Sequence, residues 1–197
     1  AAEYMKKAGY PSGKYTGKDE LLMVGTSEGV AQKAGHDLVI DVGQWEAVAE
    51  VRDDGTLSAV QLTADPRSLQ VREGLRGIKP LTDKDRADIR NTIDERILFG
   101  RRIAFDSTAV ETGNGGLTVR GELELAGMRR PVSFELDAAA APHLDEAIEL
   151  CLASKPVRGT LPVTQSEWGI KPYRGLMGAL KVRDTVEVVL EVALPST

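Results

Sequence analysis

The chain has 197 residues, of which 42% are hydrophobic and 28% charged, and its formal net charge is −5. This composition is ordinary for a soluble globular protein, and the length allows one large domain or two small ones. Basic and acidic residues are interleaved, whereas nucleic-acid binders usually gather basic residues on one face, so we expect no nucleic-acid partner. No apolar run approaches the ~20 residues that span a bilayer, so we expect no stable membrane insertion.

The first part of the chain carries little information about the fold. Residues 1–19 are rich in lysine, glycine and polar groups and are interpreted as a flexible lead-in or an added segment, followed by one domain over residues 20–197. The single cysteine, Cys151, excludes an intrachain disulfide. No signal peptide is visible, so a cytoplasmic location is the default expectation. A periplasmic or secreted location follows if a signal peptide has been removed.

Alternation of apolar and polar residues predicts strands through most of the chain. In residues 36–42, for example, Leu38, Ile40 and Val42 alternate with two aspartates. Pro162 requires a sheet edge or a bulge in its strand, because proline lacks the N–H that a strand ladder uses. The predicted strands cover residues 36–42, 45–51, 56–64, 103–110, 117–125, 132–137, 157–165 and 186–194.

Short turns connect several of these strands. The segments Asp53-Asp54-Gly55 and Asn114-Gly115-Gly116 are typical of hairpins. Seven or eight strands joined in this way indicate an all-β sandwich or barrel.

One helix is predicted between the two groups of strands. Thr82 is a suitable N-cap, and Asp83 and Asp85 follow in the first turn, where acidic groups favour the positive end of the helix dipole. The apolar stripe is narrow and consists of isoleucines one turn apart, Ile89, Ile93 and Ile97. Such a stripe predicts a lid or flank lying across the barrel. Residues 172–180 are a further candidate for a short helical turn.

The sequence contains no pattern typical of catalysis. His36 and His143 lack the close spacing of a zinc site, and no nucleophile elbow, P-loop or dinucleotide fingerprint is present. We therefore expect no metal, no cofactor and no enzyme. His36 follows Gly35, and two roles remain open for it: a hydrogen bond to the backbone at the strand start, or a polar contact to a ligand head group.

The bulky aromatic residues also have two interpretations. They either line a ligand cavity or fill the core and leave no cavity. These residues are Trp45, Phe105, Phe134 and Trp168. Aromatic residues make up only 5% of the chain, and an aliphatic lining suits a flexible hydrocarbon chain better than a planar ring.

Five segments of the chain are informative in combination: 34–42 followed by Trp45, 79–86 with the helix after it, 117–132, 165–173 and 178–184. In order and spacing, from about residue 20 to residue 194, the chain resembles the YceI-like family. The resemblance implies an extended, lipocalin-like antiparallel barrel of eight strands, with one amphipathic helix packed beside it. It further implies binding of polyisoprenoids or other long-chain amphiphiles in an elongated lumen. The segment 138–156 looks longer and more irregular than the family's hairpin.

The resemblance leads to a functional hypothesis. We expect the chain to bind a polyisoprenoid, a prenyl quinone or a fatty-acid derivative for carriage or storage. Residues predicted at the cavity mouth are His36, Trp168, Tyr173 and Arg174. Residues predicted to line the cavity are Leu38, Ile40, Trp45, Phe105, Leu123, Phe134, Leu176 and Met177.

Two other functions remain open at this stage. One is a stress-related interaction module whose barrel is filled by side chains and takes no ligand. The other is a small hydrolase that uses His36 with a nearby carboxylate. Because family members often pair, a homodimer is a further expectation.

Overall fold

The computed structural model describes residues 13–16, 20–25, 27–28, 36–51, 57–77, 79–113, 116–137, 157–175 and 180–192. Several residues that the sequence singles out lie outside these ranges: Asp53, Asp54, Gly55, Asn114, Gly115, His143, Cys151, Leu176, Met177, Leu194 and the segment 138–156.

Strands make up most of the described chain. They are β1 (Gly13–Thr16), β2 (Glu20–Gly25), β3 (Ser27–Glu28), β4 (Asp37–Val42), β5 (Trp45–Val51), β6 (Leu57–Ala64), β7 (Leu69–Leu75), β8 (Ile103–Gly113), β9 (Gly116–Leu125), β10 (Met128–Asp137), β11 (Val157–Thr164), β12 (Arg174–Gly175), β13 (Leu180–Val182) and β14 (Thr185–Val192). The helical elements are η2 (Pro66–Ser68), α2 (Asp83–Thr92), its π-helical continuation η3 (Ile93–Leu98) and η4 (Gln165–Trp168).

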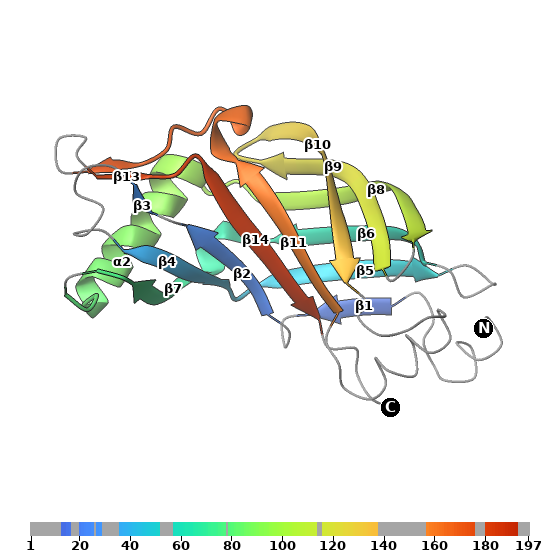
Figure 1. The fold of residues 1–197 in the computed structure, drawn as a ribbon, viewed down its shortest axis with the longest axis horizontal. Coiled ribbons are helices and arrows are strands. Elements are labelled where there is room, and N and C mark those ends of the chain that lie inside the picture. Colours follow the sequence, from blue (N-terminus) through green and yellow to red (C-terminus); the bar gives the residue numbers. More distant parts are fainter. Residues whose placement is uncertain are drawn as a thin grey trace.

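Most of the described strands form one curled antiparallel sheet that surrounds the core (Figure 1). Eleven strands take part in the order β1-β5-β6-β8-β9-β10-β11-β14-β2-β4-β7, and β12, β13 and β3 form a small second sheet. The chain runs from β4 directly into β5 and from β6 through η2 into β7, so each pair acts as one long bent strand. If β4 with β5 and β6 with β7 are each counted as one strand and β1 is left out, the large sheet has eight strands around the core. This arrangement confirms the barrel-like fold.

The bend is held by backbone hydrogen bonds at the corner of the long hairpin. Gly43 N donates to Ser68 O at 3.2 Å, and Asp65 N donates to Gln44 O at 2.9 Å. The Ser68 hydroxyl adds a third link, because it accepts a hydrogen bond from Gln44 N at 2.9 Å. These bonds join the two ends of the sheet and bring the strands around the core.

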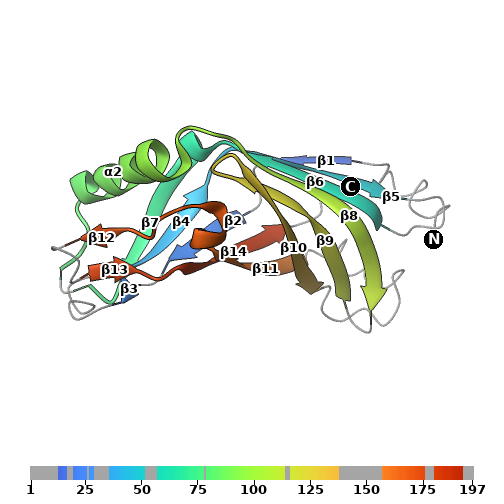
Figure 2. The ribbon, with the colours of Figure 1, turned by 90° about the horizontal axis from the view of Figure 1, so that it is seen from above.

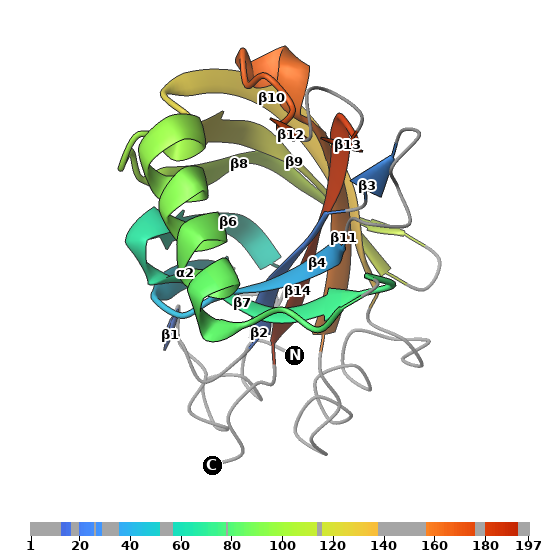
Figure 3. The same cartoon turned by 90° about the vertical axis from the view of Figure 1, so that its left-hand side faces the viewer.

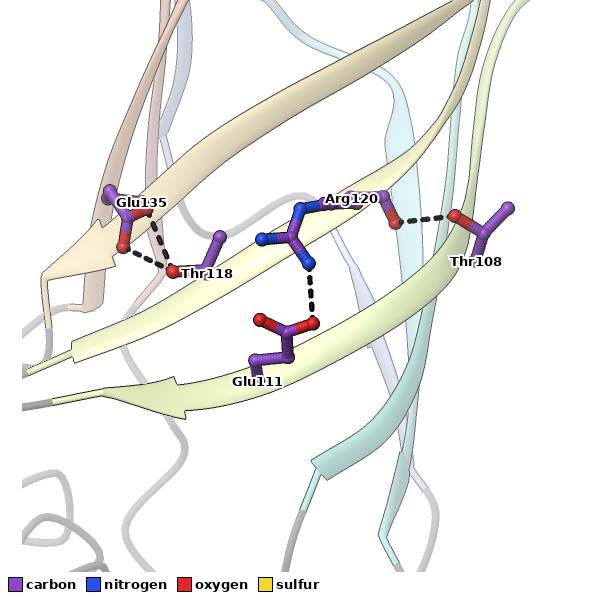
Figure 4. A network of polar contacts seen from close by, with 5 residues as sticks. All are labelled: Thr108, Glu111, Thr118, Arg120 and Glu135. Carbon is purple, nitrogen blue, oxygen red and sulfur yellow. Dashed lines mark hydrogen bonds and ion pairs between the residues drawn. The ribbon is translucent and has the colours of Figure 1, made fainter.

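The predicted alternation of buried and exposed residues is confirmed in β9, which pairs with β8 on one side and with β10 on the other. Val119 of β9 is fully buried on the inner face, and its neighbour Arg120 is exposed on the outer face. Figure 4 shows this outer face, where Arg120 pairs with Glu111 of β8 and the Thr118 hydroxyl donates to Glu135 of β10. Exposed pairs of this kind add little stability, so the fold rests mainly on the apolar inner face.

The helix begins at Thr82, as predicted, and crosses one end of the barrel (Figures 2 and 3). Thr82 and Asp85 form a capping box, in which Thr82 N donates to Asp85 Oδ2 at 2.9 Å and Asp85 N donates to Thr82 Oγ1 at 3.2 Å. Arg86 ties the helix to the sheet, since its guanidinium donates to the carbonyls of Val71 and Arg72 in β7. The helix therefore lies against the edge strand β7 and covers the opening beside it.

Proline in β11 sits where the sequence requires it. Pro162 pairs with Glu187 of β14, whereas β10 meets β11 in the described residues only at Leu136 with Gly159 and at Asp137 with Arg158. The side of Pro162 that faces away from β14 is thus a local edge, and the missing N–H breaks no ladder there.

Three local expectations differ from the structure. Residues 13–16 were expected in the lead-in but form β1, which pairs with β5. Arg174 and Gly175 were expected in a helical turn but form β12, and the helical turn nearby is η4. Asp37, which alternation places on the polar face of its strand, is only 4% exposed, and Arg76, the residue after β7, pairs with its carboxylate.

No helix in the described part of the chain is both long enough and apolar enough to cross a membrane.

Candidate functional site

The barrel encloses a cavity of about 440 Å³. Its wall consists mainly of aliphatic side chains from the inner faces of the strands and from the helix. On the sheet side the wall includes Leu38, Ile40, Val42, Leu62, Leu123, Leu161, Val186, Val188 and Leu190. The cavity joins the two halves of the core, because Leu62, Val188 and Leu190 pack against both apolar clusters.

The helix contributes the roof of the cavity. The isoleucine stripe of Ile89, Ile93 and Ile97 lines the cavity together with Leu98. The π-helical turns of η3 keep Ile93 and Leu98 buried, at 8% and 5% exposure. The narrow stripe thus covers an apolar space, as expected for a lid or flank.

Two aromatic rings stand in the wall. Phe105 of β8 and Phe134 of β10 meet edge to face, with their ring centroids 5.4 Å apart. Gly121 of β9 makes room for Phe105, since a Cβ at Gly121 would lie 2.6 Å from the Phe105 ring. The absence of a side chain at Gly121 therefore leaves the space that the Phe105 ring occupies.

Most of the polar residues in the wall belong to elements at one end of the barrel. Asp88 and Thr92 come from α2, Tyr173 precedes β12, and Lys181 lies in β13. Figure 3 looks at this end, which α2 borders on one side and β12 and β13 border on the other. We define this end as the mouth of the cavity. A polar mouth and an apolar interior suit a molecule with a polar head and an apolar chain.

His36 lies in the wall at the start of β4 and bonds the backbone. Its Nε2 lies 2.7 Å from the carbonyl oxygen of Lys79, so this nitrogen carries the hydrogen and donates it. The ring occupies the space above Gly77, where a Cβ would lie 2.0 Å from Nε2. No carboxylate among the described residues hydrogen-bonds to His36. His36 therefore bonds the backbone and also lines the cavity, and its contact with a ligand head group stays a prediction.

A buried polar residue completes the wall away from the helix. Gln165, at 7% exposure, begins η4, and its Nε2 donates to the carbonyl of Arg183 at 2.9 Å.

Among the described residues, no cluster of three or more His, Cys, Asp or Glu side chains gathers where it would hold a metal ion.

The structure brings together most of the residues predicted for the site. Those that line the cavity are His36, Leu38, Ile40, Phe105, Leu123, Phe134 and Tyr173. Trp45 and Trp168 are buried in the core, at 5% and 3% exposure, and do not line the cavity. Arg174 is exposed in β12, outside the wall, and Leu176 and Met177 lie outside the described residues.

Several wall residues were missed in the sequence. The polar ones are Asp88, Thr92, Gln165 and Lys181. Isolated polar residues give no sequence signal for a shared site, because the fold alone gathers them. For the apolar wall a signal was present: Val186, Val188 and Leu190 alternate along β14, as lining residues of one face do.

Comparison with known proteins adds a family and a fold. The model of the YceI-like domain family matches residues 19–194. No curated protein matches the chain. The crystal structure of BcnA from Burkholderia cenocepacia is similar with a TM-score of 0.59 at 15% identity, covering 88% of this chain and 94% of that one. The Campylobacter jejuni YceI protein is similar with a TM-score of 0.51 at 12% identity, covering 78% of this chain and 81% of that one. At these identities, the structural similarity concerns the fold.

Proposed function

Because the chain belongs to the YceI-like domain family, we propose that it binds a long-chain amphiphile in its barrel and carries or stores it unchanged. Candidate cargoes are a polyisoprenoid, a prenyl quinone or a fatty-acid derivative. The observation that carries the proposal is the cavity of about 440 Å³, whose interior is aliphatic and whose polar residues gather mainly at its mouth.

The energetics favour an alkyl or prenyl chain as cargo. Each CH₂ group that leaves water contributes about 0.8 kcal/mol, so a long chain gains several kcal/mol before the costs of ordering it. The cavity volume falls within the roughly 300–1,000 Å³ of small-molecule sites. Affinity would come from the wall and orientation from the polar mouth.

The same observations weigh against the two alternatives. A filled barrel would leave no continuous cavity, yet the core contains one. A hydrolase based on His36 would need a partner carboxylate to orient the imidazole, whereas the Nε2 of His36 is engaged with the Lys79 carbonyl. We therefore propose binding without a catalytic step.

Native mass spectrometry of the purified protein tests the proposal directly, followed by organic extraction and identification of the released molecule. We expect a long-chain amphiphile in stoichiometric amount. A protein that is empty and also takes up neither added prenyl quinones nor fatty acids would contradict the proposal.

A matched pair of variants on β14 tests whether the cavity is the binding site. Val188 lines the cavity, and its neighbour Glu187 is exposed on the outer face. Val188→Phe should reduce the bound cargo several-fold, because the added ring takes up cavity volume. Glu187→Phe adds a bulky ring to the same strand and should leave the cargo unchanged. Equal retention in both folded variants would place the cargo elsewhere.

A further inference from the structure

Two cations lie next to each other at the mouth of the cavity. Arg174 of β12 stands directly opposite Lys181 of β13 in the register of the small sheet. Residues directly opposite each other in an antiparallel pair place their side chains on the same face, about 5 Å apart at Cβ. Like charges in this position repel each other, and no described acidic side chain forms an ion pair with either residue.

We propose that the cargo carries an anionic head group, a carboxylate or a phosphate, that binds to Lys181 and Arg174 at the mouth. This inference rests on the proposed function, and it selects among the candidate cargoes. A prenyl quinone has no charge to offer two cations, whereas a fatty acid or a prenyl or alkyl phosphate has one.

Lys181 connects the two cations with the cavity. It lines the cavity and is half-buried, whereas Arg174 is exposed. A lysine in this position lays its aliphatic stem along the apolar wall and keeps its ammonium group at the polar edge. A chain in the cavity would therefore end beside this ammonium group. A charge that is partly removed from water gains more from a counter-ion than a fully solvated one.

The other charged residues near the mouth do not cancel this preference. Asp88 of α2 is exposed, and Lys84 precedes it by one helical turn, so water and a neighbouring cation screen its charge. Glu28 of β3 stands directly opposite Lys181 as well, on the side of β13 that faces away from Arg174. The row of Arg174, Lys181 and Glu28 still has one positive charge in excess.

Carboxylates and phosphates are suited to this arrangement. A guanidinium group binds two oxygens of such an anion through parallel hydrogen bonds, and an ammonium group adds a compact point charge. The Tyr173 side chain also lines the mouth, with 46% of its surface exposed, and offers a hydroxyl as a further donor. Arg174, Lys181 and Tyr173 would thus hold the head while the wall holds the chain.

The test compares three molecules with the same sixteen-carbon chain: hexadecanoate, hexadecyl phosphate and the neutral hexadecanol. Their affinities are measured by displacement of a neutral fluorescent probe from the delipidated protein. The variants are Lys181→Met and Arg174→Gln. The control is Lys171→Met, which removes the same charge from an exposed position outside the cavity wall.

We expect the wild-type protein to bind one or both anions roughly fivefold to tenfold more tightly than hexadecanol, the size expected for a partly exposed ion pair. Lys181→Met should remove most of this preference, measured as the ratio of anion affinity to hexadecanol affinity in the same variant, and Lys171→Met should preserve the ratio. The ratio of the two anion affinities identifies the carboxylate or the phosphate as the better head group.

Two results would overturn the inference. One of them leaves the proposed function intact, and the other contradicts it as well. If all three molecules bind with equal affinity to wild type and to Lys181→Met, the head group is not recognised by charge, and the proposed function stands. If none of the three binds, both the inference and the proposed function fail.

Discussion

The indole of Trp168 connects two parts of the barrel that the strand ladder does not join. Trp168 is 3% exposed in η4, which follows β11 and packs against β10. Its Nε1 donates to the Leu123 carbonyl of β9 at 3.2 Å. One residue earlier in η4, the Glu167 carbonyl accepts a hydrogen bond from Arg130 of β10. The residue is therefore structural, although the sequence made it a candidate for the mouth.

We predict that Trp168→Phe lowers the free energy of unfolding by roughly 1–3 kcal/mol, because it removes the hydrogen bond and part of the buried volume. Cargo affinity should change little, since the indole is not part of the wall. Urea unfolding and a binding titration measure the two quantities separately. A large loss of affinity at unchanged stability would instead restore Trp168 as a ligand contact.

At the scale of single elements, the start of α2 carries a charge-dependent cap. Hydrogen bonds from the side chain and the backbone of Thr82 lower the pKa of Asp85 below its ordinary value. A carboxyl group with a lowered pKa in the folded state adds stability above its unfolded pKa, near 4, and this contribution is lost as the pH falls through the folded pKa.

We predict that Asp85→Ala destabilises the protein at pH 7 and that its difference from the wild type shrinks as the pH falls below about 4. Asp83→Ala is the control, because Asp83 lies in the same helical turn but outside the capping box. Denaturant unfolding at pH 7, 4 and 2.5 measures both variants. A difference for Asp85→Ala that stays constant down to pH 2.5 would show that the cap does not depend on the ionised carboxylate.

The elements also show how far sequence patterns reach. Alternation identified β9 and β14, and the cap and the isoleucine stripe identified α2, because these signals are local in the chain. The bend between β4 and β5 was not predicted, since its hydrogen bonds join Gly43 and Gln44 to Asp65 and Ser68 more than twenty residues later. Alternation identifies two faces of a strand but does not say which one faces the core.

The same reasoning explains the candidate site. Leu38, Ile40 and Phe134 were predicted because they stand on strongly alternating strands, and they do line the cavity. Trp45 was predicted as a bulky residue on an alternating strand too, yet it packs into the core beside the bend. Lys181 was missed because its place at the mouth depends on the pairing of β12, β13 and β3, which short segments do not reveal.

At the scale of the whole molecule, the cavity takes the place of a continuous apolar core. The two core clusters pack around it and share Leu62, Val188 and Leu190. An occupied cavity restores contacts that an empty one lacks, so cargo and fold should stabilise each other.

We predict that removal of the cargo lowers the midpoint of thermal unfolding and that added cargo restores it. A ligand at about 100 times its Kd adds roughly 2.7 kcal/mol to the stability of the folded state. Calorimetry of the protein before delipidation, after it and after reloading measures the effect. Identical midpoints in all three samples would show that the cavity is not the site of a stabilising ligand.

The join between β10 and β11 has a mechanical consequence. Within the described residues, β10 pairs with β9 alone from Met128 to Phe134, and Trp168 and Ile170 belong to the core cluster against which Phe134 packs. Backbone ladders resist stretching, whereas packed side chains slide past one another at lower cost. Among the described strand pairs around the barrel, β10 and β11 share the fewest register positions, so the circumference should stretch most easily at this join. A cargo wider than the cavity would be accommodated by separation of β10 from β11. The width of cargo that the barrel accepts would then depend on how far these two strands can separate.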